Sequence, residues 1–160
     1  MRPAEPFVAV HLDAVPRGPD RGPGIGELKP VRRHLGITAF GANARVARTA
    51  GEVLVMRHDE RAGGPWGTEG HEELYVVLRG RATFRLDGRE VDAPAGTLLF
   101  VRDPAVVREA VAAEADTAVL AVGAPPGEPY RVAPWEQRDI DAQEQRGIES
   151  QERRDIDSQR

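Results

Sequence analysis

Four residues near the middle of the sequence bring imidazole and carboxylate groups close together along the chain. They are His58, Glu60, His71 and Glu73. This combination of groups suits Fe, Mn, Ni or Zn. Three protein ligands would leave coordination positions open for a substrate or O₂. The first interpretation of the sequence is therefore a divalent metal site.

The same groups also have a purely structural interpretation. His58 would simply end a strand, His71 would be a polar loop residue, and Glu73 would pair with Arg102 or Arg108 inside the fold. A buried carboxylate needs such a partner, because otherwise its pKa rises until it takes up a proton. Both interpretations stay open at the level of the sequence.

Residues 70–96 predict the strands that would position these groups. The segment contains an apolar strand, a glycine, an alternating strand, the pair Asp87-Gly88, a third strand and a Pro-Ala-Gly corner. An Asp-Gly pair suits a type I′ turn, because both central positions need positive φ. Glu73 and Tyr75 share one face of the first strand, since strand side chains alternate. Short strands between turns indicate a sandwich or barrel rather than βαβ units.

Turn residues divide the rest of the chain into further short elements. We expect strands at residues 37–47, 52–58, 72–79, 81–87, 89–92, 97–102, 106–111 and 117–122. One helical turn is expected at 30–36, after a Gly- and Pro-rich loop at 16–30. Residues 59–70 form a long polar loop around Trp66, and such loops often act as lids or binding loops. Trp66 is a candidate lid residue, with anchoring of the loop as an equal alternative.

With these strands, the sequence resembles the cupin superfamily, and in particular its small single-domain members. The first cupin motif ends in a Glu, six residues and a Gly, and the segment from Glu73 to Gly80 matches this spacing. The second motif begins with a Gly that starts a strand, as Gly96 does. The resemblance covers residues 37–122. It implies an all-β fold, a double-stranded β-helix or jelly-roll barrel with an internal pocket.

The metal-binding residues of that family are only partly present. Cupins usually hold a divalent metal through a His-x-His pair before the Glu and a His late in the second motif. Here the segment 58–60 (His-Asp-Glu) stands in place of the pair, and Val107, beside Arg108, stands at the late position. The candidate ligands for a metal are therefore His58, His71 and Glu73, with Glu60 as a further candidate.

The remaining segments are expected to be appendages of one domain. Residues 1–36 form an N-terminal arm and loop, 37–135 the cupin barrel, and 136–160 a charged tail of three similar octads. Each octad carries one Ile, and eight residues advance ~800° around a helix, so these positions drift by ~80° and form no stripe. We expect a solvated tail that is partly helical or disordered.

Composition excludes several classes of function. The 160 residues carry a net charge of −4, and their 22 basic residues are scattered among acids, which argues against a nucleic-acid partner. The sequence has no Cys, so it has neither disulfides nor thiolate chemistry. No apolar stretch approaches the ~18 residues of a membrane span. We expect a cytoplasmic protein without membrane contact.

The function predicted from the sequence is small-molecule binding inside the barrel, with a divalent metal as a candidate cofactor. The pocket residues expected from the sequence are Glu73, Tyr75, Thr83, Arg108 and Trp66. One alternative is a metal-dependent cupin enzyme of the dioxygenase or isomerase type. Another is a dimeric interaction module. A homodimer is expected in any case, because strand 72–79 is apolar on both faces and residues 7–12 could be an exchanged strand.

Overall fold

The structure is a computed structural model that describes residues 6–64 and 68–158. Its strands are β1 (Glu27–Lys29), β2 (Gly41–Val46), β3 (Val53–His58), β4 (Glu72–Arg79), β5 (Arg81–Leu86), β6 (Arg89–Pro94), β7 (Leu98–Val101), β8 (Arg108–Ala112) and β9 (Ala118–Ala124). The helices are a 3₁₀ turn η1 (Leu12–Ala14), α1 (Val31–Leu35) and α2 (Pro134–Ser158). The eight strands predicted from the sequence are present as β2 to β9.

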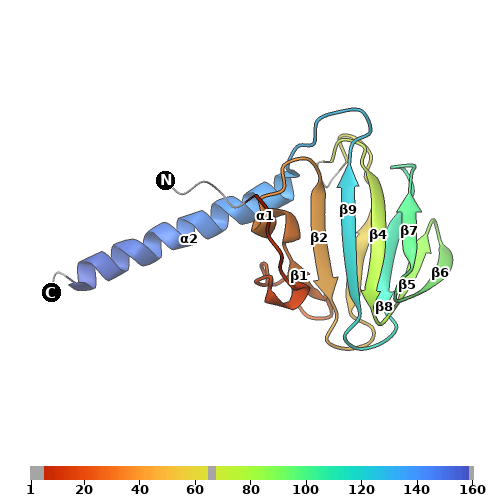
Figure 1. Ribbon diagram of the computed structural model, residues 1–160, viewed down its shortest axis with the longest axis horizontal. Helices are drawn as coiled ribbons and strands as arrows, with labels where there is room; N and C mark the ends of the chain where they lie inside the picture. Colours follow the sequence, from red (N-terminus) through yellow and green to blue (C-terminus); the bar gives the residue numbers. More distant parts are fainter. Residues whose placement is uncertain (1–5, 65–67, 159–160) are drawn as a thin grey trace.

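Two antiparallel sheets face each other across the core. One has the strand order β1-β2-β9-β4-β7 and the other β3-β8-β5-β6 (Figure 1). The prediction of a jelly-roll barrel is confirmed. The hairpin between β5 and β6 turns at Asp87 and Gly88, whose φ values are 48° and 83°, as the type I′ prediction requires.

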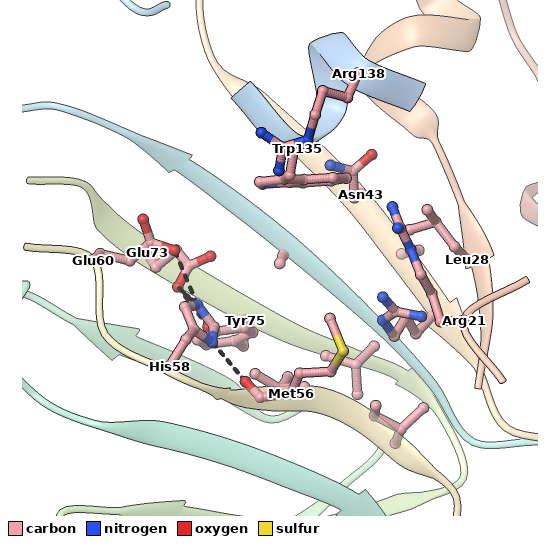
Figure 2. A pocket seen from close by; sticks show the side chains of 16 residues that line it. Arg21, Leu28, Asn43, Met56, His58, Glu60, Glu73, Tyr75, Trp135 and Arg138 are labelled. Carbon is pink, nitrogen blue, oxygen red and sulfur yellow. Dashed lines mark hydrogen bonds and ion pairs between the residues drawn. The ribbon is translucent and has the colours of Figure 1, made fainter. Parts of the chain in front are cut away.

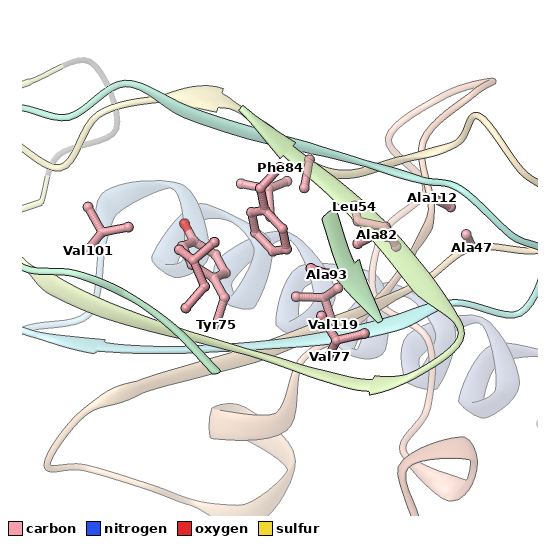
Figure 3. Close-up of a cluster of buried hydrophobic side chains, with 13 residues drawn as sticks. Ala47, Leu54, Tyr75, Val77, Ala82, Phe84, Ala93, Val101, Ala112 and Val119 are labelled. Atoms are coloured by element: carbon pink, nitrogen blue, oxygen red, sulfur yellow. The ribbon is translucent and has the colours of Figure 1, made fainter. Parts of the chain in front are cut away.

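Alternation along the strands determines which side chains enter the core. Tyr75 and Val77 of β4 are buried, and so are Ala82 and Phe84 of β5 (Figure 3). The Tyr75 and Phe84 rings meet across the space between the sheets, with centroids 5.4 Å apart. This core fixes the inward direction of every second residue on β4 and therefore also of Glu73.

The segment predicted to be a loop at residues 16–30 contains strand β1. Leu28 of β1 pairs with Arg45 of β2, and the strand extends the first sheet at its edge. Its sequence, Glu-Leu-Lys between a Gly and a Pro, carries no strand pattern of its own. Pairing with the neighbouring strand is what makes it extended.

The predicted tail is one long helix whose first turns belong to the domain. Helix α2 begins at Pro134, before the predicted boundary, and projects away from the barrel (Figure 1). Arg32 of α1 holds its start through a buried ion pair with Glu136, with Nε and Oε1 2.7 Å apart. Ile148 and Ile156, further along, are exposed, in agreement with the absence of an apolar stripe. In the part of the chain that the structure describes, no helix is long and apolar enough to span a membrane.

Residues 7–12, predicted as a strand, make no strand within the single chain. They form no regular element before η1 begins at Leu12, and Phe7 and Val8 are exposed. An unpaired extended segment gains no ladder hydrogen bonds, so it becomes a strand only if another edge pairs with it. The expected exchange with a second copy therefore stays a prediction.

Candidate functional site

Three of the four candidate metal ligands meet at one place in the barrel. His58 ends β3, Glu60 follows it in the next loop, and Glu73 projects from β4 (Figure 2). His58 Nε2 lies 2.9 Å from Glu60 Oε1 and 3.8 Å from Glu73 Oε2. One ligand atom from each residue lies within 4.8 Å of the other two. One imidazole and two carboxylates at these separations could hold a metal ion.

The neighbours of Glu73 on the sheet hold it in the cluster. Gly123 of β9 is its register partner, and a Cβ atom there would lie 3.0 Å from Glu73 Cγ. The glycine therefore leaves room for the carboxylate side chain. Tyr75, two residues along the same face, donates a hydrogen bond from its hydroxyl to Glu73 Oε2 at 2.5 Å. Position and orientation of the carboxylate are thus both determined.

Arg108 supplies the cation that a buried carboxylate needs. It is fully buried on β8, where it is the register partner of His58. Its Nη1 lies 3.6 Å from Glu73 Oε2. Arg102, the other candidate partner, is exposed and its guanidinium lies 5.4 Å from the centre of the Phe100 ring. The expected pairing of Glu73 with an arginine is therefore made by Arg108.

Burial and crowding of charge shift the protonation of the cluster. Burial raises the pKa of Glu73 to about 7, and the charge of Glu60 adds to this, while Tyr75, His58 and Arg108 act against it. Burial alone would lower the pKa of His58, but the hydrogen bond with Glu60 and the charge of Glu73 outweigh it and the pKa is raised. Both groups therefore hold protons more strongly than in water, and a bound cation would compete with those protons.

His71 contacts the cluster from outside it. Its Nδ1 lies 3.7 Å from Glu60 Oε2, and its ring packs against Tyr130 with centroids 5.7 Å apart. Burial lowers the pKa of His71, although the charges of Glu60 and Glu69 act against this, and the shift favours the neutral ring. Among the described residues, the group with ligand geometry comprises His58, Glu60 and Glu73, and His71 lies beside it at Glu60.

Two residues expected in the pocket are placed differently or lie outside the structure. Thr83 lies on β5 between the buried Ala82 and Phe84, and so points to the opposite face of the sheet, away from the core. The strand was predicted correctly, but Thr83 is on its outer face. Trp66 lies outside the described residues.

A cavity of about 260 Å³ lies between the two sheets and includes the cluster in its wall (Figure 2). Strands β2, β3, β4 and β9 line it, together with Leu28 of β1, Arg21 of the preceding loop, and Trp135 and Arg138 of α2. Glu73 and Tyr75 line it as predicted, whereas Arg108 lies behind Glu73. The first turns of α2 thus close a site that the sequence assigned to the barrel alone.

Sequence reasoning missed a second polar group of the cavity wall. Asn43 and Arg45 of β2 both line the cavity, as does Arg21. Two polar residues at alternate positions of the strand Gly41–Val46 are a signal that could have identified the first pair, since they share one face. Arg21 comes from an irregular loop, whose sequence carries no such periodicity.

Comparisons with known proteins agree with this architecture. The sequence family described as AraC-like ligand binding domain matches residues 50–146. This span includes the first turns of α2. A cupin protein from Bacteroides fragilis is similar in structure, with 17% identity, a TM-score of 0.56, and coverage of 80% of this chain and 92% of that one. A search of curated protein sequences found no match.

Two further solved structures show the same fold. One is a sugar phosphate isomerase of the cupin superfamily from Silicibacter pomeroyi, with 16% identity, a TM-score of 0.56, and coverage of 72% of this chain and 74% of that one. The other is a predicted oxalate decarboxylase from Thermotoga maritima, with 17% identity, a TM-score of 0.52, and coverage of 72% and 97%. At these identities the likeness establishes the cupin fold and nothing about activity.

Proposed function

Because the chain belongs to the family of AraC-like ligand binding domains, within the cupin superfamily, we propose that it binds a small molecule in the cavity between its sheets, with a divalent metal ion held by His58, Glu60 and Glu73. The observation that carries the proposal is the cavity of about 260 Å³ with this cluster in its wall. Its size lies just below the range of roughly 300–1,000 Å³ usual for ligand pockets. A small metabolite fits that space better than a large cofactor.

A separate observation on the three candidate ligands supports a bound metal ion. Glu60 Oε2 is buried and has no hydrogen-bond partner among the described residues. An unsatisfied buried carboxylate oxygen is unfavourable, and a cation between Glu60 and Glu73 would satisfy it. One imidazole with two carboxylates suits Mn, Fe, Ni or Zn. When bound, such an ion would act as a Lewis acid toward an oxygen of the ligand.

Filling the cavity should abolish ligand binding. Ala121 of β9 lines the cavity and has no polar side-chain atom. Ala121→Leu should place extra methyl groups where the ligand sits, and a compound that stabilises the wild type in a thermal-unfolding screen of metabolites should no longer stabilise the variant. Val111→Leu, on the outer face of the other sheet, is the matched control. A screen without any stabilising compound, or hits that stabilise Ala121→Leu equally, would contradict the proposal.

We also propose that two copies associate through the outer face of β4 and β7. Leu98 and Phe100 of β7 are 68% and 49% exposed, and they pair in register with the apolar Val76 and Leu74 of β4. A continuous exposed apolar patch of this kind is typical of an interface. The exposed arm that begins at Phe7 lies on the β1 side of the barrel, while β7 is the opposite edge of the sheet (Figure 1). The arm of one copy is therefore placed to cover the patch of another rather than its own.

A charge in this patch should separate the copies. Phe100→Glu would bury a carboxylate against apolar side chains on association, so we expect a monomer in light scattering coupled to size exclusion where the wild type is a dimer. Val111→Glu, an apolar-to-acidic change on the outer face of the other sheet, should leave the dimer intact. A monomeric wild type, or a dimer that Phe100→Glu leaves unchanged, would overturn the interface.

A further inference from the structure

The wall of the cavity that β2 contributes carries polar side chains directed inward. Asn43 and Arg45 are the register partners of Ala121 and Val119 of β9. Directly opposed residues of an antiparallel pair point to the same face, and both β9 residues line the cavity. Figure 2 shows Asn43 and Arg21 on the side of the cavity away from Glu60 and Glu73.

The positive charge on this wall is only partly balanced. Arg45 Nη1 donates a hydrogen bond to the carbonyl oxygen of Gly26 at 2.9 Å. Among the described residues, no carboxylate lies within 4.0 Å of its guanidinium, whereas the buried Arg32 has Glu136 at 2.7 Å. Burial lowers the pKa of Arg45 to about 10, and the nearby charge of Arg21 contributes to this. Two like charges thus lie close to each other in a poorly hydrated space.

Arg21 lines the cavity, is held in place by α2 and has one unused hydrogen-bond donor. Its guanidinium bonds to Asp139 of α2 and lies 5.8 Å from the centre of the Trp135 ring. Its Nε is buried and has no hydrogen-bond partner within the described part of the chain, and the same is true of Asn43 Oδ1. A rigid guanidinium with an unused buried donor is preorganised to bind an acceptor.

We propose that the ligand carries an anionic group, a carboxylate or a phosphate, which binds at Arg21 and Arg45, and that its other end is a neutral polar group at His58, Glu60 and Glu73. This inference rests on the proposed small-molecule function and names the chemical class of the ligand. Asp139 already pairs with Arg21, so an anion would balance the charge of Arg45, and the planar fork of a guanidinium suits a carboxylate as well as a phosphate. In the metal-free protein the carboxylates of Glu60 and Glu73 would repel the same anion, so the anionic end of the ligand lies at Arg21 and Arg45.

Three six-carbon polyols, one neutral and two with an anionic end group, test this assignment. Sorbitol is neutral, gluconate ends in a carboxylate, and sorbitol 6-phosphate ends in a phosphate. In calorimetric titrations of the full chain, at least one of the two anions should bind on the order of 10-fold or more tightly than sorbitol. Whichever anion binds more tightly identifies the group. Equal binding of all three, or no binding by either anion, would overturn the inference.

Substitutions of Arg45 test whether this residue causes the preference for an anionic ligand. Arg45→Met should reduce the affinity for the preferred anion on the order of 10- to 100-fold, and Arg45→Lys by less, because the charge remains without the fork. The matched control is Arg57→Met, on neighbouring β3, where Arg57 is exposed and pairs with Glu109. Thermal unfolding without ligand shows whether each variant is folded. Wild-type anion affinity in folded Arg45→Met would overturn the inference.

The outcomes separate this inference from the proposed function. If neutral metabolites stabilise the wild type but not Ala121→Leu, and neither anion binds more tightly than sorbitol, the cavity remains the binding site and the anion subsite is excluded. If no compound, neutral or anionic, binds in the cavity of the wild type, both the proposed function and the anion subsite are excluded.

Discussion

Glu73→Gln is expected to weaken divalent-metal binding by a factor of at least ~100. The change removes one of three ligands, and even the loss of residues that merely orient ligands reduces metal affinity by roughly 10- to 100-fold. Gln preserves the size of the side chain and can still accept the Tyr75 hydroxyl hydrogen bond. Titration of chelator-treated protein with Mn²⁺, Fe²⁺, Ni²⁺ and Zn²⁺, together with elemental analysis of the purified protein, measures the effect.

Glu72→Gln is the matched control for this experiment. Glu72 precedes Glu73 on β4 and, by strand alternation, projects from the other face of the sheet. The control should bind the metal as the wild type does, while His58→Ala should lose it as Glu73→Gln does. The metal site would be refuted if the wild-type protein bound none of these metals at a one-to-one ratio. Equal metal affinities of Glu73→Gln and Glu72→Gln would also refute it.

Replacement of Arg108 with Met should destabilise the metal-free protein by about 3–5 kcal/mol at about pH 8, because it leaves a buried carboxylate without its cation. At about pH 5.5 the loss of stability in the same variant should be small. Since the folded protein raises the pKa of Glu73 from 4.5 to about 7, folding is favoured by protonation, and stability falls as the pH rises through this window. At about pH 5.5, below the pKa of about 7 in the folded protein, Glu73 is mostly protonated and needs no cation. Urea unfolding of chelator-treated protein at both pH values measures the difference.

A second substitution tests whether the loss acts through Glu73. In the double variant Arg108→Met with Glu73→Gln, neither buried charge remains, so most of the stability at about pH 8 should return. Arg85→Met breaks the exposed pair with Glu90 on β6 and should change the stability by less than about 1 kcal/mol. A loss that is equal at both pH values, or one that persists in the double variant, would show that Arg108 acts through packing alone.

Much of the fold could be predicted from the sequence, because strand alternation and turn formation depend on neighbouring residues. The Asp87-Gly88 pair specified its hairpin, and the eight predicted strands formed near their expected positions. The inward direction of Glu73 followed from its alternation with Tyr75 and was confirmed by the register of β4. His58 and Glu60 could be nominated for the same reason, since they flank the end of a recognisable strand.

The tertiary structure alone decided which groups share the cavity. The pairing of β8 with β3 placed Arg108, and not Arg102, beside Glu73, and the packing of β5 directed Thr83 outward. Arg21 and Trp135 lie more than a hundred residues apart in the chain and meet only because α2 docks on α1 and on the loop before β1. Local sequence sets the period of a strand. Register, facing direction and the closure of a cavity depend on long-range packing, whose free energy is shared among residues that the sequence does not place together.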